Sequence, residues 1–171
     1  DGLPPGATLE SDSFFDVFYD ITRTPGGPLG GEVDQFKGTL RLKMSGTGTL
    51  AGYHRTIPIT GVQAEVHTGP RTPGAPVQSF DTDMFRLQGQ VIGDPDFDLL
   101  RITGGGGFSM PSPGHTTLTR MPDGNWNVDS FFDIEYRIDF VGAPGGPLSG
   151  MSGSTTATIR MTQGVQVDPP P

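Results

Sequence analysis

The chain has 171 residues, with 11 Lys and Arg against 19 Asp and Glu, which gives a net charge of −8 and a pI of about 4.6. This acidic balance argues against nucleic-acid binding, because no basic surface is present to displace the counterions of a phosphate backbone. The sequence has no cysteine, which excludes disulfides, thiol catalysis and thiolate metal sites. No apolar run approaches the roughly 18–20 residues that span a bilayer, so no membrane span is expected.

The chain begins at Asp1 and not at a methionine. Such a start is expected after removal of a secretion signal, with proteolysis as the alternative. We therefore expect a bacterial protein that is extracellular or on the cell surface. At the other end, three prolines follow Asp168, which predicts an extended Pro-rich tail over 164–171.

An internal repeat organises the sequence. Residues 12–21, DSFFDVFYDI, recur as residues 129–138, DSFFDIEYRI, at an offset of 117. Two further blocks follow in the same order in both copies at an offset of 119: PGGPL at 25–29 and 144–148, then GTLRL at 38–42 and ATIRM at 157–161. Three ordered matches indicate that one ancestral unit was duplicated.

Both copies alternate apolar and polar residues with a period of two. In the second copy, Phe132, Ile134 and Tyr136 alternate with Asp133 and Glu135. This pattern predicts a strand, because successive side chains of a strand point to opposite faces. The Gly-Pro segment that follows predicts a loop, since Gly permits positive φ and Pro interrupts a strand. Each copy is therefore predicted to be strand, loop and strand.

The sequence between the copies has the same character. Runs that are rich in β-branched residues, or that alternate, are separated by Gly or Pro. These runs are 56–67, 77–92, 97–103 and 115–120. Asp123-Gly124 predicts a hairpin before the repeated strand at 126–140. We predict an all-β fold, an antiparallel β-sandwich or a barrel-like sheet built from a duplicated β unit.

The repeat also sets the expected domain boundaries. A truncated first β repeat occupies 1–50, a connecting β segment 51–79 and a fuller second repeat 80–163, before the tail at 164–171; one compact domain overall is the alternative. A truncated unit leaves a sheet edge unpaired, and an open edge invites strand addition from another chain.

Four stretches of the sequence carry a family resemblance. They are GDPDFD at 93–98, PGHTTLT at 113–119, VDSFFDI at 128–134 and VGAPGGPL at 141–148. In them the chain resembles repeat modules of large secreted proteins of planctomycete-type bacteria. The resemblance covers residues 80–163 well and 5–45 in part. It implies secretion and a modular architecture, and it supplies no catalytic residues.

One acidic segment is a candidate metal site. Asp94, Asp96 and Asp98 alternate along an extended segment, which places their carboxylates on one side. Ca²⁺ takes six to eight oxygen ligands, and clustered carboxylates can provide several of them. The alternative is a solvated turn and strand face. Calcium is the one cofactor that the sequence suggests.

Other residues with chemical potential are interpreted as structural. The pairs Asp12 with Asp16 and Asp129 with Asp133 resemble a two-carboxylate hydrolase, but their repetition at a strand start favours hydrogen bonds to backbone. The three histidines lack the spacing of a zinc site, and Ser109 lacks the strained elbow of serine hydrolases. We therefore expect no enzyme.

The function that these features favour is a structural subunit of a secreted assembly: a filament, a sheath or a surface layer. Duplication, β-richness and an acidic surface fit self-association through sheet edges or strand exchange. The segments expected to make the subunit contacts include Leu3 and Leu9 near one end, and Val165 and Val167 near the other.

A glycan-binding or adhesion module, stabilised by calcium, is the alternative function. It would use Trp126, with Tyr53 and Tyr136, to stack on sugar rings. A tryptophan beside a hairpin turn is more often a local packing anchor, and this second interpretation of Trp126 stays open at the sequence level.

Overall fold

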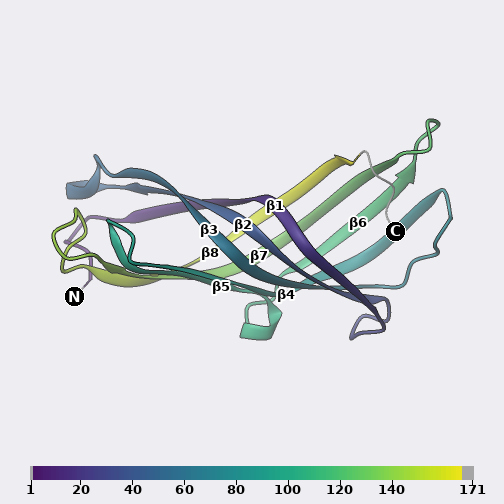
Figure 1. The fold of residues 1–171 in the computed structure, drawn as a ribbon, viewed down its shortest axis with the longest axis horizontal. Coiled ribbons are helices and arrows are strands. Elements are labelled where there is room, and N and C mark those ends of the chain that lie inside the picture. Colours follow the sequence, from purple (N-terminus) through teal and green to yellow (C-terminus); the bar gives the residue numbers. More distant parts are fainter. Residues whose placement is uncertain (1, 167–171) are drawn as a thin grey trace.

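The computed structural model describes residues 2–166, and within this range it describes no side chains for 11–20, 161 and 163–166. The fold is all-β and barrel-like, which confirms the predicted class (Figure 1). The strands are β1 (Leu9–Pro25), β2 (Glu32–Gly46), β3 (His54–Thr68), β4 (Val77–Ile92), β5 (Phe97–Gly104), β6 (Pro113–Arg120), β7 (Trp126–Gly142) and β8 (Ser152–Gln166). Two 3-10 turns, η1 (Gly48–Leu50) and η2 (Gly106–Phe108), lie in the connections.

All eight strands belong to one sheet, in which neighbouring strands are antiparallel. Strands β5 and β6 share a single position between β4 and β7. β5 pairs with the second half of β4 and the second half of β7, whereas β6 pairs with the first half of each. They are two parts of one strand path, interrupted by the excursion over 105–112 that carries η2 and projects from the sheet in Figure 1.

The direction of the two outermost strands follows from this arrangement. The positions across the sheet are β1, β2, β3, β4, the shared β5–β6 path, β7 and β8, which makes seven. Because direction alternates at every step, the first and seventh positions run the same way. Figure 1 shows both β1 and β8 leaving the end of the molecule that holds the N-terminus.

The duplicated units are the two outer hairpins of the sheet. β1 and β7 each have 17 residues, and β2 and β8 each have 15. The pairing next to the two Gly-Pro loops is equivalent, since Thr24 opposite Val33 corresponds to Val141 opposite Ser152. Further along, the two registers differ, because each hairpin has bulges at its own positions.

The core lies on the concave face of the curled sheet. Along β7, Ile134, Tyr136 and Ile138 are buried on this face, as the period of two predicts. They pack with aliphatic residues of β2, β3 and β5 and with Phe97. Burial of each large side chain contributes about 1.5–3 kcal/mol. A second, smaller cluster of Leu118, Trp126 and Val128 lies under the β6–β7 hairpin.

The excursion that interrupts β5 and β6 begins at a glycine that no other residue could replace without strain. Gly105 has φ of +99°, and a Cβ there would lie 2.6 Å from the carbonyl oxygen of Phe85. The left-handed backbone and the close approach together require glycine.

Among the described residues, no helix has the length and apolar character needed to cross a membrane.

Candidate functional site

The two outermost strands define an open seam along the sheet. In the described part of the chain, β1 pairs only with β2 and β8 pairs only with β7. Parts of β1 and β8 approach within 8 Å between Cα atoms, but no ladder joins them, and paired strands lie about 4.7–4.9 Å apart. Each of the two edges therefore presents backbone groups without a strand partner.

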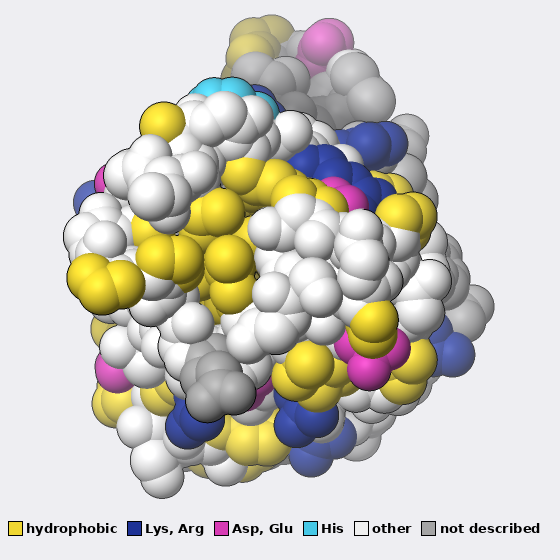
Figure 2. Space-filling model, turned by 90° about the vertical axis from the view of Figure 1, so that its left-hand side faces the viewer, with side chains coloured by type: hydrophobic (Ala, Val, Ile, Leu, Met, Phe, Trp, Pro, Cys, Tyr) yellow, Lys and Arg dark blue, Asp and Glu magenta, His cyan; other side chains and the backbone are white. Residues whose placement is uncertain are grey.

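The seam opens at one end into an apolar cavity of about 260 Å³. Its apolar lining comes from the N-terminal segment, the start of β1, the end of β2 and β7, and its polar lining from the start of β8. The lining includes Leu3, Leu9, Met44, Ile138, Phe140 and residues 152–155. Figure 2 views this end of the molecule and shows hydrophobic side chains gathered inside a rim of polar and backbone atoms.

The N-terminal segment is held against this opening by contacts within the chain. Leu3 and Leu9 pack against the core cluster, and Ala7 is buried. The Thr8 backbone N–H donates to Thr47 Oγ1 at 2.9 Å, and the Thr47 N–H donates to the Thr8 carbonyl at 2.9 Å. Leu3 and Leu9, expected as subunit contacts, thus line the chain's own cavity.

The other expected contact residues lie at the far end of β8. The backbone of Val165 pairs with Asn127 of β7. The side chain of Val165, and Val167 altogether, lie outside the described residues.

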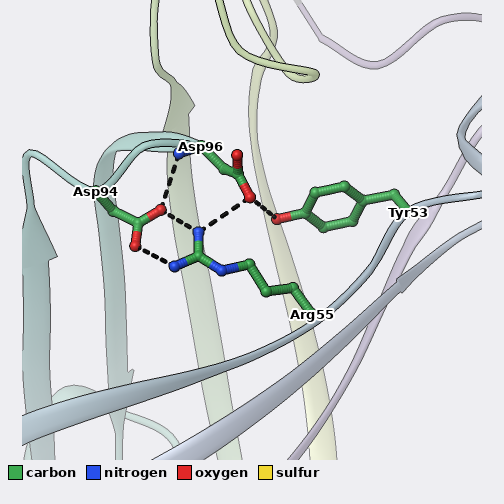
Figure 3. Close-up of polar contacts among 4 residues, drawn as sticks. All are labelled: Tyr53, Arg55, Asp94 and Asp96. Carbon is green, nitrogen blue, oxygen red and sulfur yellow. Dashed lines mark hydrogen bonds and ion pairs between the residues drawn. The ribbon is translucent and has the colours of Figure 1, made fainter.

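The acidic segment between β4 and β5 is paired with an arginine side chain of the same protein, Arg55 (Figure 3). Both terminal nitrogens of Arg55 donate hydrogen bonds to the Asp94 carboxylate, and Nη2 lies 2.6 Å from Oδ2. Arg55 Nη1 also donates to Asp96 Oδ2 at 3.0 Å, and the Tyr53 hydroxyl donates to the same oxygen at 3.1 Å. Hydrogen bonding to Arg55 lowers the pKa of the Asp94 carboxyl. Burial, together with the charge of Asp96, raises the pKa of Tyr53.

This network stands where the sequence suggested calcium. Arg55 hydrogen-bonds to both oxygens of Asp94 and to one oxygen of Asp96, and its positive charge opposes a second cation nearby. Asp98 is exposed and takes no part in the cluster. Among the described residues, no three His, Cys, Asp or Glu side chains are placed to hold a metal ion. The network fixes the β4–β5 loop against the start of β3.

The repeated acid pairs do not form a two-carboxylate site where they are described. Asp129 and Asp133 lie four residues apart on one strand, which separates them by about 13 Å, beyond the roughly 5–9.5 Å that glycoside hydrolysis requires. Asp133 accepts two hydrogen bonds from Arg160 at 2.7 and 2.8 Å. The side chains of Asp12 and Asp16 lie outside the described residues.

The three aromatic residues of the glycan hypothesis do not form an exposed platform. Trp126 is 8% exposed and Tyr136 is 2% exposed, both within the core clusters. Tyr53 is half-buried, and its ring forms a T-shaped pair with that of Phe97, with 6.4 Å between centroids. Packing therefore accounts for these side chains, and the interpretation of Trp126 as a packing anchor is the correct one.

A Ser-His-Asp chain on the convex face went unnoticed in the sequence. Ser79 Oγ lies 2.6 Å from His115 Nε2, and His115 Nδ1 lies 2.9 Å from Asp81 Oδ1. The connectivity matches that of a catalytic relay. However, the Asp81 side chain is 84% exposed, and the ladder between β4 and β6 uses the local backbone groups that an oxyanion hole would need. These Ser-His-Asp hydrogen bonds link β4 to β6 across the sheet surface.

Toward the end opposite the cavity, polar side chains replace apolar ones on the concave face. Gln78, Thr82, Thr116 and Ser130 are buried there. Thr116 and Ser130 hydrogen-bond to each other at 2.8 Å, but Gln78 Oε1 and Thr82 Oγ1 have no partner within the described structure. Asp34 lies in the same half, and burial raises its pKa to about 6.

No protein-family model matches the sequence, and no curated protein or solved structure is significantly similar to the chain.

Proposed function

We propose that the chain is a non-enzymatic structural subunit of a secreted extracellular assembly, and that subunits associate through the edges of their sheets. The observation that carries this proposal is the open seam, in which two long strands each pair on one side only. An exposed edge is a template for another strand, since backbone hydrogen bonds give affinity and alternating side chains give specificity.

The duplication supports the view that both free edges can pair. β1 corresponds to β7, and the edge of β7 that faces away from β8 pairs with β5 and β6. β8 corresponds to β2, and the edge of β2 that faces away from β1 pairs with β3. The free edges of β1 and β8 therefore correspond to edges of β7 and β2 that pair with a neighbouring strand within the same sheet.

The ionisable groups also favour a structural role. Two acidic residues form ion pairs between elements: Asp94 of the β4–β5 loop with Arg55 of β3, and Asp133 of β7 with Arg160 of β8. The Ser79 chain lies on an exposed face outside the cavity. These contacts stabilise the fold without leaving an activated group in a cleft.

Size measurement tests this proposal. The purified chain is examined by light scattering and analytical ultracentrifugation from about 1 µM to about 1 mM, a range that covers dissociation free energies of about 4–8 kcal/mol, and by negative-stain electron microscopy. Oligomers or filaments are expected at the upper concentrations. A mass of 18.1 kDa at every concentration would overturn the proposal. Fractionation of producing cells tests the extracellular location separately.

A further inference from the structure

The two edges of the seam differ in how well their sequences protect them from pairing. β1 contains Glu10, three further carboxylates and a terminal Pro25. Charged residues and proline are features by which natural edge strands avoid association. β8 contains no Asp, Glu, Lys or Pro over its 15 residues, and Arg160 is its only charged residue. β8 is therefore the unprotected edge.

Two polar side chains on the outer face of β8 contact β7. Arg160 bonds to Asp133 through both Nε and Nη2, and its guanidinium lies 4.4 Å from the ring centroid of Phe131. Ser154 receives a hydrogen bond from Arg137 at 3.1 Å. These described contacts draw the side chains away from the free edge, so they leave its backbone open to a partner.

The chain itself cannot complete this edge with an ordinary antiparallel ladder. β1 is the nearest strand across the seam, and it runs parallel to β8. The sheet has seven strand positions, so strand direction reverses six times between the first position and the last. All the pairings of the sheet are antiparallel. A strand that continues the sheet in the same manner beyond β8 has to come from elsewhere.

We propose that β8 pairs antiparallel with β8 of a second copy of this chain, about a twofold axis perpendicular to the strands. The inference rests on the proposed function and names the edge and the partner. A twofold arrangement is self-complementary, because each residue before the axis meets one after it in the other copy. The exposed Thr156 and Thr158 would then face small polar residues of the same strand, and such cross-strand Thr pairs are favourable.

The test places like charges on this edge. Thr158 and Thr162 are exposed on the same face as Arg160, and the double variant Thr158→Lys/Thr162→Lys brings three positive charges from each copy together at the β8–β8 interface. The matched control is Thr60→Lys/Gln88→Lys, which adds the same charge at exposed positions of β3 and β4, away from both edges of the seam. Circular dichroism and thermal unfolding verify that each variant is folded.

We expect the wild type and the control to form dimers by analytical ultracentrifugation, and the β8 variant to dissociate with a Kd raised at least tenfold, because like charges oppose each other across the ladder. The variant Thr22→Lys/Thr24→Lys, on β1, should dimerise as the wild type does.

Two results separate this inference from the proposed function. If the β1 variant loses association and the β8 variant keeps it, or if both lose it, β8–β8 pairing is wrong while association through sheet edges stands. A wild type that stays monomeric at all concentrations would overturn both.

Discussion

Substitution of Asp34 tests whether the polar half of the interior weakens the fold at neutral pH. Asp34 lies in β2 opposite Val66, on the concave face, and its side chain is 20% exposed. Its Oδ1 has no hydrogen-bond partner among the described residues, and Arg23 Nε lies 3.9 Å from it. Burial, with a smaller contribution from the charge of Glu32, raises the pKa of this carboxyl from 3.8 to about 6.

The raised pKa fixes the sign of the pH dependence. Below about pH 4, Asp34 is protonated in both the folded and unfolded states. Between about pH 4 and about pH 6 the folded state retains the proton that the unfolded chain releases, so the free energy of unfolding falls as pH rises. Above about pH 6 the folded state carries the full free-energy cost of burying the ionised carboxylate. The interval from 3.8 to about 6 corresponds to about 3 kcal/mol, and partial exposure reduces this to about 2–3 kcal/mol.

We therefore expect Asp34→Asn to be more stable than the wild type by about 2–3 kcal/mol at pH 7 and by much less at pH 4. Urea unfolding followed at pH values from 4 to 8 measures both differences. Asp98→Asn, at an exposed position outside the Arg55 network, is the control and should change stability by less than about 0.5 kcal/mol. A difference between Asp34→Asn and the wild type that is constant with pH, or a destabilised variant at pH 7, would refute the reasoning and show that Arg23 compensates for burial.

Three further outcomes can be measured with single substitutions. Leu42→Ala removes a side chain with no exposed surface and should cost about 2–5 kcal/mol by urea unfolding, whereas Ile92→Ala, at a side chain that is 70% exposed, should cost less than about 0.5 kcal/mol; equal effects would contradict the assigned core. Gly105→Ala should destabilise more than Gly74→Ala in the same assay, because both have positive φ but only the first lacks room for a Cβ. Ser79 should not be labelled by a fluorophosphonate probe, and labelling that mass spectrometry maps to Ser79 would contradict the non-enzymatic proposal.

The strands could be predicted from sequence where one face is buried and the other is solvated. The alternation over 126–140 matches β7 because every second residue from Ile134 to Phe140 packs in the core. The Asp-Gly hairpin is also confirmed, since the Gly124 N–H donates to the Met121 carbonyl at 3.0 Å and Gly124 has φ of +89°. These features depend on neighbours in the sequence, and a single sequence contains that information.

The features that sequence reasoning missed depend on pairings between distant segments. Arg55 meets Asp94 across 39 residues, and no local pattern marks an arginine as the partner of that carboxylate. Likewise, Ser79 and His115 become neighbours only because β6 pairs with the first half of β4. The repeated carboxylates suggested chemistry, but the strand geometry that separates Asp129 from Asp133 shows why repetition alone was a poor guide.

The shared position of β5 and β6 determines that the two edges of the seam run parallel to each other. Two outer hairpins contribute four positions, and β3, β4 and the shared path contribute three. If β5 and β6 had occupied separate positions, the total would be eight, and β1 and β8 would be antiparallel and able to close the barrel by the ladder used elsewhere. Fusing the two strands by removing the excursion over 105–112 would keep the total at seven, so β1 and β8 would remain parallel. The parallel direction of the two edges is therefore a consequence of how the duplicated hairpins are joined, and it does not depend on the sequence of either edge strand.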